Sequence, residues 1–359
     1  MSTTINEPTN SDPEVLKKYQ ATAAGNLEEE FYEFIKREPP IPTCFPSLNE
    51  ALDGGIYPGL IIFGALTSLG KTTFLTQLAD GMAQERDVIF LSLEMGKYEI
   101  IGKSISRMTY EKCKIRNHAK TTLGVIDGSR RAKYKDEEVE LIDECASQYF
   151  NSSERLFIFD GIGEIDVNKV RDIITKHIDL TGNIPVVFID YLHVLSPTDE
   201  HRRSTERQIV EYNVSTLRRI SYTMNVPIIA ISSFNRDNYN APVNLSSFKE
   251  SGLIEYSADI ILGMQLYGMD KLKSSDAKKI ESIAIIEKLK MEEPRTAQLK
   301  ILKQRFGPVG LSLYFKYQAK FNHFEETDEP SGSKSDEDDI LSKLPNQSDI
   351  KQEESDYPF

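Results

Sequence analysis

The sequence predicts an α/β fold in which a mostly parallel, twisted sheet is flanked by helices and is completed by antiparallel strands near the C-terminus. Between about residues 41 and 324, short apolar runs alternate with helical patterns, which is typical of parallel strands joined by crossover helices. One apolar run leads into a tight loop and then a helix that opens with a Lys-Thr pair. From residue 281 to 318, apolar and polar residues alternate between Pro and Gly turns, which predicts antiparallel strands.

The parallel strands are predicted from short runs rich in Val, Ile and Phe. A helix is predicted between the fourth and fifth runs, because Ile209, Leu217, Ile220 and Met224 share one face before Pro227. The predicted strands are Leu60–Gly64, Val88–Leu93, Leu156–Asp160, Ile184–Asp190, Pro227–Ser232 and Asp259–Met264, and the antiparallel segments are ESIAIIEKLK (281–290), TAQLKILKQRF (296–306) and VGLSLYFKY (309–317).

Charge separates the two ends of the chain from its middle. The net charge is -13, but residues 1–40 carry 8 acids and 4 bases and residues 325–359 carry 12 acids and 3 bases, so residues 41–324 are neutral overall. A neutral body neither excludes nor supports a nucleic-acid partner. Residues 325–359 have few large apolar side chains and are predicted to form a disordered acidic tail.

Residues 1–40 are predicted to be an acidic arm that contains one amphipathic helix over residues 27–36. Leu27, Phe31, Phe34 and Ile35 share a face, with acids in the first turn and Pro39-Pro40 as the stop. The same pattern fits packing against the chain's own domain and docking on a neighbouring subunit, so both interpretations stay open.

Composition excludes several classes of protein. No apolar run approaches the ~20 residues that span a bilayer, and the N-terminus lacks the basic and apolar regions of a signal peptide. We therefore expect a cytoplasmic protein without a membrane partner. The cysteines at 44, 113 and 145 are far apart and have no CxxC spacing, so neither a zinc site nor a disulfide framework is predicted.

The segment FGALTSLGKTTF, residues 63–74, predicts a phosphate-binding loop. Backbone N–H groups of the loop and of the helix N-terminus would face an anion, Lys71 would reach the terminal phosphates, and the Thr72 hydroxyl would ligate Mg²⁺. The usual pattern has Gly where this chain has Ala65, with Gly64 one place earlier. The predicted nucleotide-binding positions are Ala65, Ser68, Gly70, Lys71, Thr72, Thr73 and Asp190.

Two carboxylates follow buried strands and supply the remaining catalytic groups. Glu94, in SLEM after the second strand, is the candidate general base that orients the attacking water. Asp190 ends the apolar run VVFID, where a carboxylate is costly unless something satisfies it, and it is predicted to hold Mg²⁺ through water. For any one such residue, a structural role such as capping a turn is the common alternative. That alternative is improbable for the phosphate-binding loop, Glu94 and Asp190 occurring together in this order.

These motifs, taken in order, resemble the ATPase domain of the DnaB family of hexameric replicative helicases, which has a RecA-like fold. The resemblance covers about residues 41–324, and Ala65 is the family's own residue at that loop position. It implies ATP and Mg²⁺ as cofactors and a homohexameric ring on single-stranded DNA. The matching segments are IPTCFPSLNEALDGGIYPG, ALTSLGKTTF, SLEM, VVFIDYLHVL, ERQIVEYNVSTLRRIS, AISSFNR, SSFKESGLIEYSADIIL and KQRFGPVG.

The resemblance implies roles for residues at matching positions. KQRFGPVG would supply Lys303 and the arginine finger Arg305 to ATP bound by the adjacent subunit. SSFKESG resembles the loop that grips the single-stranded DNA backbone, through Lys249, Glu250 and the Gly252 backbone.

Other positions depart from the family or fit two interpretations. Arg202 and Arg203 follow the Asp190 strand and either face the channel or begin a solvated helix. His193 stands where the family usually has Gln, and Ser233 stands where a longer polar side chain senses the terminal phosphate. Ser233 is short, so either it acts through water or His193 takes the sensor role. The family's N-terminal primase-interaction domain is also expected to be missing.

The C-terminal SDYPF resembles the acidic tip of bacterial single-stranded-DNA-binding proteins. It predicts docking on a replication-protein partner, with a solubilising acidic tail as the alternative.

The sequence therefore favours an ATP hydrolase that translocates on single-stranded DNA as a ring and unwinds duplex during replication, in a phage or mobile element. The alternative is a RecA-like ATPase that acts as a DNA- or protein-binding switch, as a loader, recombination or defence component. A small-molecule kinase is disfavoured, because it would have no use for an arginine finger at Arg305 or for the DNA-gripping loop that SSFKESG resembles.

Overall fold

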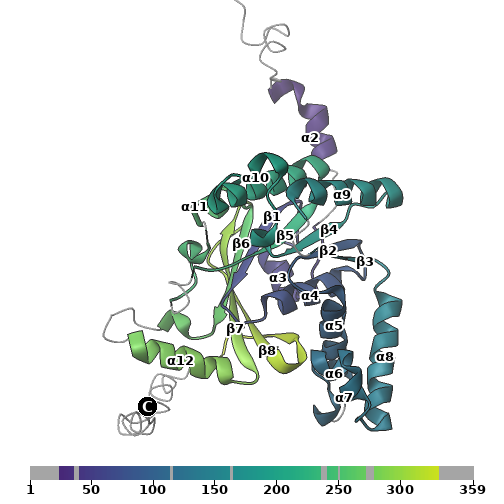
Figure 1. Cartoon of the computed structure of the whole chain (residues 1–359). Helices are drawn as coiled ribbons and strands as arrows, with labels where there is room; N and C mark the ends of the chain where they lie inside the picture. Colours follow the sequence, from purple (N-terminus) through teal and green to yellow (C-terminus); the bar gives the residue numbers. More distant parts are fainter. Residues whose placement is uncertain are drawn as a thin grey trace, which may run out of the picture. The chain divides into compact units, whose positions relative to one another are not determined.

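A nine-stranded sheet forms the centre of the computed structural model (Figure 1). The structure describes residues 24–35, 40–113, 116–161, 165–235, 241–249, 251–271 and 279–330. The chain divides into one unit of residues 1–40 and a second of residues 41–359. In the first unit, helix α2 (Glu28–Ile35) lies within the range expected for the amphipathic helix. Its last expected residue, Lys36, and the acidic tail beyond Pro330 lie outside the described residues.

The strand order of the sheet is β3-β2-β4-β5-β1-β6-β7-β8-β9. The six strands from β3 to β6 in this order pair in parallel, and β7, β8 and β9 follow as antiparallel neighbours. The fold class predicted from the sequence is thereby confirmed. The strands are β1 (Gly59–Ala65), β2 (Val88–Ser92), β3 (Leu156–Asp160), β4 (Val186–Asp190), β5 (Pro227–Ser232), β6 (Ile260–Leu266), β7 (Arg295–Gln304), β8 (Ser312–Gln318) and β9 (His323–Thr327).

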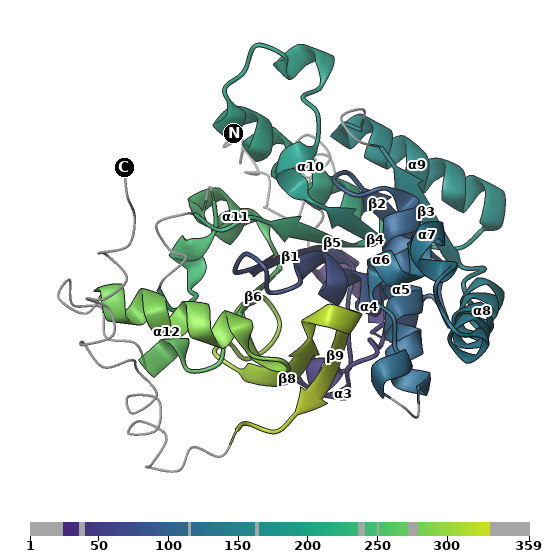
Figure 2. The same ribbon diagram turned by 60° about the horizontal axis from the view of Figure 1, so that its bottom comes forward.

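Helices cover both faces of the parallel part. Figure 1 shows α9, α10 and α11 on one side of the sheet and α4 and α5 on the other. α8 packs against α5, and α12 packs against β6 and β7, well away from α8 (Figure 2). The helices of the second unit are α3 (Pro46–Ala51), α4 (Lys71–Met82), α5 (Lys97–Lys112), α6 (Thr122–Ile126), α7 (Gly128–Arg131), α8 (Asp136–Ser152), α9 (Val167–Thr181), α10 (Glu206–Met224), α11 (Ser251–Ser257) and α12 (Lys279–Met291).

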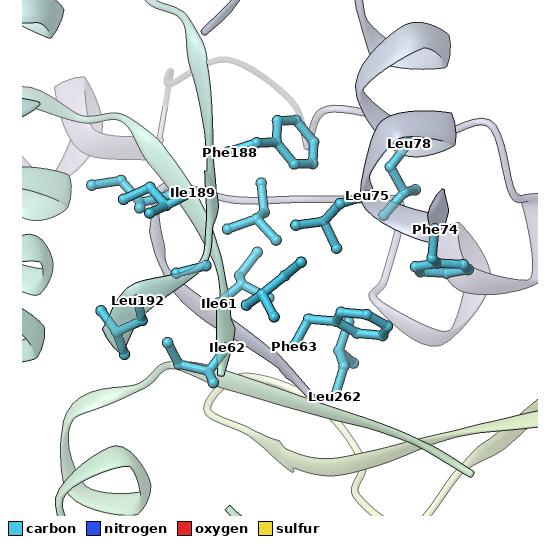
Figure 3. Close-up of a cluster of buried hydrophobic side chains, with 14 of the residues drawn as sticks. Ile61, Ile62, Phe63, Phe74, Leu75, Leu78, Phe188, Ile189, Leu192 and Leu262 are labelled. Atoms are coloured by element: carbon cyan, nitrogen blue, oxygen red, sulfur yellow. The ribbon is translucent and has the colours of Figure 1, made fainter. Parts of the chain in front are cut away.

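Burial on both faces explains why the parallel strands appear in the sequence as unbroken apolar runs. Every residue of β1, β2, β4, β5 and β6 is buried. Side chains of β1 and α4 meet in the core, where the rings of Phe63 and Phe74 stack with centroids 5.1 Å apart (Figure 3). This packing fixes the position of the loop that joins β1 to α4.

Helix α10 follows the rules that its sequence predicts. The Thr205 hydroxyl accepts from the N–H of Gln208 and forms a capping box with that side chain, and Asn225 ends the helix in the left-handed region at φ 55°. Val210, Val214, Leu217 and Ile220 lie on the face that is buried against the sheet.

Two C-terminal segments differ from their predicted structure. Residues 281–290, expected as a strand, belong to α12, where Ile286 is buried and Leu289 packs beside the core at helical spacing. Glu287 and Lys290 pair three residues apart, 2.7 Å between Oε1 and Nζ, and Glu, Lys, Leu and Ala favour helix. Residues 325–327, assigned from the sequence to the acidic tail, form part of β9 because they pair with β8 next to the buried Phe324.

Candidate active site

The loop between β1 and α4 has the backbone geometry of an anion cradle. Ser68 and Gly70 both lie in the left-handed region, at φ 66° and 76°. A Cβ on Gly70 would lie 2.5 Å from Cζ of Tyr317, so glycine is required there for space as well as for conformation. Arg295 holds the loop from β7, because its Nη1 donates to the Ser68 carbonyl at 2.7 Å.

The N-terminus of α4 opens directly onto this loop. Gly70, at the N-cap position, has no side chain that could accept a hydrogen bond. The first backbone N–H groups of α4 therefore have no side-chain cap and can donate to a bound anion. Lys71 Nζ donates to the Ala65 carbonyl at 3.2 Å. Burial lowers the pKa of Lys71, and the charges of Asp190 and Glu94 oppose that shift.

A cavity of about 180 Å³ lies beside the loop, at the carboxyl ends of the parallel strands. It brings together five of the predicted site residues, which come from α4 and from the ends of β2, β4 and β5. The cavity is lined by Thr67, Lys71, Thr72, Glu94, Asp190, Tyr191, Ile231, Ser233 and Phe234. A wider open hollow of about 490 Å³ between α5 and α8, where Lys112 pairs with Glu144, holds none of the predicted site residues.

Asp190 has the properties of a cation ligand. Its side chain is 2% exposed, it accepts a hydrogen bond from Thr72, and its Oδ2 is buried without a partner among the described residues. Burial raises the pKa of Asp190 to about 6, the Thr72 hydrogen bond opposes the shift, and Glu94 adds to it. An orphaned buried carboxylate oxygen beside a hydroxyl fits Mg²⁺. Nowhere in the described ranges do three His, Cys, Asp or Glu residues cluster to hold a metal alone, so other ligands would come from water and nucleotide oxygens.

Backbone pairing joins the cavity to the predicted DNA-binding segment. Lys249 N–H donates to the Ser233 carbonyl at 2.9 Å, and Phe234 forms an antiparallel bridge with Phe248. The two rings meet edge to face with centroids 4.9 Å apart, over Gly64 of β1. A movement of the Ser233 segment would therefore move Lys249. Gly252 lies on α11, whereas Glu250 lies outside the described residues.

His193 follows β4 and is not among the residues that line the cavity. It belongs to the 3₁₀ turn Leu192–Val194, and both ring nitrogens are buried without a partner in the described part of the chain. Burial lowers the pKa of His193 to about 4; Lys249 adds to the shift and Glu206 opposes it. The side chains of Lys249 and Glu206 form an ion pair beside it. Of the two sensor candidates, the structure brings Ser233 to the cavity.

The predicted arginine finger lies away from this chain's own cavity. Arg305 Nη1 is 3.2 Å from Asp259 Oδ1 and donates to the Tyr222 hydroxyl at 2.8 Å. Lys303 Nζ donates to the Ala258 carbonyl at 2.6 Å. Neither Lys303 nor Arg305 lines the cavity, because both lie beside the amino end of β6, whereas the cavity lies at the carboxyl ends of the parallel strands.

The basic pair Arg202 and Arg203 lies on the surface between β4 and α10. Both side chains are exposed, and Arg202 Nη2 is 2.7 Å from Asp199 Oδ1 in a solvated ion pair. Thr73, expected at the nucleotide, is buried at the start of α4, with its Oγ1 3.3 Å from Lys103 Nζ.

Several residues of the site were not predicted. Thr67 and Phe234 lie inside segments that the sequence already marks, so a position-by-position reading of those segments could have found them. Asp259 precedes the buried run of β6, and the reasoning that selected Asp190 applies to it equally. No sequence signal points to Tyr222, because its contact with Arg305 joins residues 83 positions apart.

None of the described helices is both long and apolar enough to cross a membrane. Comparison with known proteins gives more specific information. The family model "DnaB-like helicase C terminal domain" matches residues 40–326. The chain is 27% identical over 308 residues to the replicative DNA helicase DnaB of Helicobacter pylori, covering 80% of this chain and 59% of that protein. It is 28% identical over 293 residues to the DnaB of Haemophilus influenzae, covering 79% and 55%.

A third relative, the probable plasmid replicative DNA helicase of Chlamydia muridarum, is 30% identical over 208 residues, or 56% of this chain and 42% of that one. The chain thus spans about half the length of these curated relatives.

Solved structures show the same fold. An ATPase domain aligns with a TM-score of 0.66 and 24% identity over 85% of this chain and 99% of the other. A DnaB-like replicative helicase, solved in a study of its interactions with primase, aligns with a TM-score of 0.65 and 23% identity over 86% and 69%. The family match covers most of the chain and includes the loop, both carboxylates and the Lys249 segment. The chain belongs to the DnaB-like helicase C-terminal domain family.

Proposed function

We propose that this chain is an ATP-dependent DNA helicase that moves along single-stranded DNA as a ring and unwinds duplex during replication. The observation that carries the proposal is the direct backbone link between the nucleotide cavity and Lys249. Ser233 lines the cavity with Lys71 and Glu94, and its carbonyl accepts from the Lys249 N–H at 2.9 Å. This link is what a motor needs if the state of the nucleotide is to move a DNA contact.

In the proposed site, the backbone N–H groups of Ser68, Gly70 and the first turn of α4 bind the phosphates of ATP, and Lys71 supplies a positive charge. Thr72 and Asp190 would hold Mg²⁺, which neutralises charge on the phosphate oxygens when it is bound. Glu94 lies in the same cavity and orients the attacking water as general base.

The second half of the site would come from the adjacent subunit. Arg305 does not line its own cavity, as expected of an arginine finger that acts in trans. Such a finger is worth ~10³ to 10⁵ in rate in related phosphate chemistry, because it meets charge that develops on the transferring phosphoryl group. Lys303 would act beside it. We therefore propose a homo-oligomer, a hexamer by family resemblance, whose activity depends on assembly.

The proposed DNA contact is to the phosphate backbone. Lys249 has a partly exposed side chain that pairs with Glu206, and a DNA phosphate would compete for it. Glu250 and the Gly252 backbone would complete the loop, and Arg202 and Arg203 are further candidates. None of these groups reads bases, which suits a motor that moves along any sequence.

Other parts of the proposal concern the replication system and the two ends of the chain. The resemblance to a plasmid replicative helicase favours a phage or mobile-element replication system, and such an activity would be cytoplasmic. We further propose domain limits of 1–40, 41–327 and 328–359, with the second limit moved to the end of β9, a ring-assembly role for α2, and docking of the SDYPF tip on a replication protein.

One observation favours the alternative, a DNA- or protein-binding switch that does not unwind. Ser233 has a short side chain, and His193, which could replace it, does not line the cavity. Weak sensing of the terminal phosphate would leave ATP binding intact while uncoupling hydrolysis from movement.

A forked-duplex unwinding assay with ATP and Mg²⁺ separates the two functions. Native protein should separate the strands, and Lys71→Ala and Arg305→Ala should not, although both should remain folded. ATP hydrolysis by the native chain without strand separation would overturn the helicase proposal and leave the switch.

A further inference from the structure

Arg305 is held in this subunit by a polar cluster formed by Asp259, Tyr222 and Arg218. Asp259 lies at the centre and is only 6% exposed. Its Oδ2 accepts from the Leu60 N–H at 2.9 Å, and its Oδ1 accepts from the Tyr222 hydroxyl at 2.8 Å. The two guanidiniums approach the same Oδ1, Arg305 at 3.2 Å and Arg218 at 3.9 Å. Two cations thus share one carboxylate.

Because two cations share this carboxylate, the Arg305 guanidinium can leave Asp259 without leaving the carboxylate unpaired. If its guanidinium left, Asp259 would keep the Leu60 N–H, the Tyr222 hydroxyl and the neighbouring Arg218. The Nε of Arg218 is buried and has no partner among the described residues, so this side chain has capacity for a further bond. A buried carboxylate left alone would be costly, and Arg218 together with the two hydrogen bonds lowers that cost.

Tyr222 sets the position of the guanidinium. Its hydroxyl accepts from Arg305 Nη1 at 2.8 Å while donating to Asp259, so one oxygen fixes both groups. Arg218, four residues earlier on α10, makes a cation–π contact with the Tyr222 ring, with its Cζ 5.4 Å from the ring centroid. Tyr222 is 47% exposed and the Arg305 side chain 37%, so the guanidinium lies at the surface.

We infer that Tyr222 is a positioning residue for Arg305. Its hydroxyl holds the Arg305 guanidinium at the surface, where this group can leave Asp259 and pair with the terminal phosphate of ATP bound by the adjacent subunit. Arg218 then becomes the main cation of Asp259. The inference rests on the proposed function, because it deepens the role given there to Arg305. Tyr222→Phe removes only the hydroxyl that sets this position and keeps the ring that packs on Arg218.

Mixed assemblies test the inference. Lys71→Ala chains have an intact finger and a dead site, and Arg305→Ala chains have an intact site and no finger. Each should be inactive alone, and a mixture should regain ATP hydrolysis at interfaces that combine the two. Tyr222→Phe placed on the Lys71→Ala chain should lower the regained kcat about 3- to 10-fold with KM unchanged, the loss expected for one hydrogen bond to a partly solvated cation.

The same change placed on the Arg305→Ala chain should have no effect, because that chain has no finger to position. Tyr267→Phe is the matched control, since Tyr267 lies beyond the opposite end of β6 from Asp259 and its hydroxyl donates to the Pro330 carbonyl at 3.1 Å. Light scattering checks that every mixture assembles equally. If Tyr222→Phe lowers the regained activity equally on the Lys71→Ala chain and on the Arg305→Ala chain, or on neither, the positioning role of Tyr222 is overturned, while the role of Arg305 as an arginine finger stands. Absence of any regained activity would overturn the finger and with it this inference.

Discussion

Gly64 is the position in the core where one added methyl group should have the clearest effect. It lies in β1, between Ser232 of β5 and Gly263 of β6, and its missing side chain makes room for the rings of Phe234 and Phe248. Both rings are buried, at 3% and 0% exposure. A Cβ on Gly64 would overlap both of them, so Gly64→Ala must displace at least one ring.

The expected magnitude follows from this overlap. Overpacking a close-packed core by one methyl group costs about 1 to 3 kcal/mol of unfolding free energy. Phe248→Leu empties part of the same space and alone should cost about 1 to 2 kcal/mol. Because the two changes act on one space, the Gly64→Ala/Phe248→Leu double variant should lose less than the sum of the single losses, by about 1 to 2 kcal/mol.

Urea-induced unfolding, followed by far-ultraviolet circular dichroism without nucleotide or DNA, measures all three losses. Gly128→Ala is the matched control, because a Cβ there meets nothing within 4 Å, and its unfolding free energy should change by less than about 1 kcal/mol. Additive losses in the double variant, or an unchanged stability for Gly64→Ala, would refute the packing argument and with it the contact between the cavity and the Phe248–Lys249 segment.

Two further predictions concern charge. The raised pKa of Asp190, about 6, makes the unfolding free energy of nucleotide-free protein fall as pH rises from about 4 to 6, whereas the lowered pKa of His193, about 4, makes it rise over that window. Relative to native protein, Asp190→Asn should therefore make the slope of unfolding free energy against pH more positive and His193→Gln should make it more negative, each by at most about 1.4 kcal/mol per pH unit in urea unfolding; equal slopes in the two variants would contradict the assignment. Glu206→Gln frees Lys249 from its ion pair and should tighten single-stranded DNA binding about two- to fivefold at low salt by fluorescence anisotropy, whereas Glu211→Gln on the same helix should not. Equal changes in both variants would show only a loss of negative charge.

The parallel strands could be predicted because five of the six, β1, β2, β4, β5 and β6, are buried on both faces, and the partly exposed β3 still forms a short apolar run. β5 has the predicted bounds, Pro227–Ser232, since turn residues border its apolar run, and β4 begins two residues later than expected, after Pro185. α12 could not be distinguished from a strand, because Ile286 is its one fully buried side chain among those described and its apolar residues follow no single face.

The site residues that could be predicted from the sequence are those at the carboxyl ends of strands. Glu94 follows β2 and Asp190 ends the neighbouring parallel strand β4, so both carboxylates were expected at the same edge of the sheet, where they line one cavity with Lys71. Ala65 could be assigned from resemblance, but the reason for Gly64 could not, because it depends on two rings more than 160 positions away in sequence. The cluster around Asp259 depends equally on long-range contacts, which local patterns do not encode.

ATP turnover with and without a single-stranded DNA oligonucleotide, in the presence of Mg²⁺, tests most directly the claim that this cavity is a hydrolytic site linked to a DNA contact. The account predicts that DNA raises turnover by the native chain and that Lys71→Ala abolishes turnover under both conditions. Turnover that DNA does not change, or turnover that survives in Lys71→Ala, would contradict it.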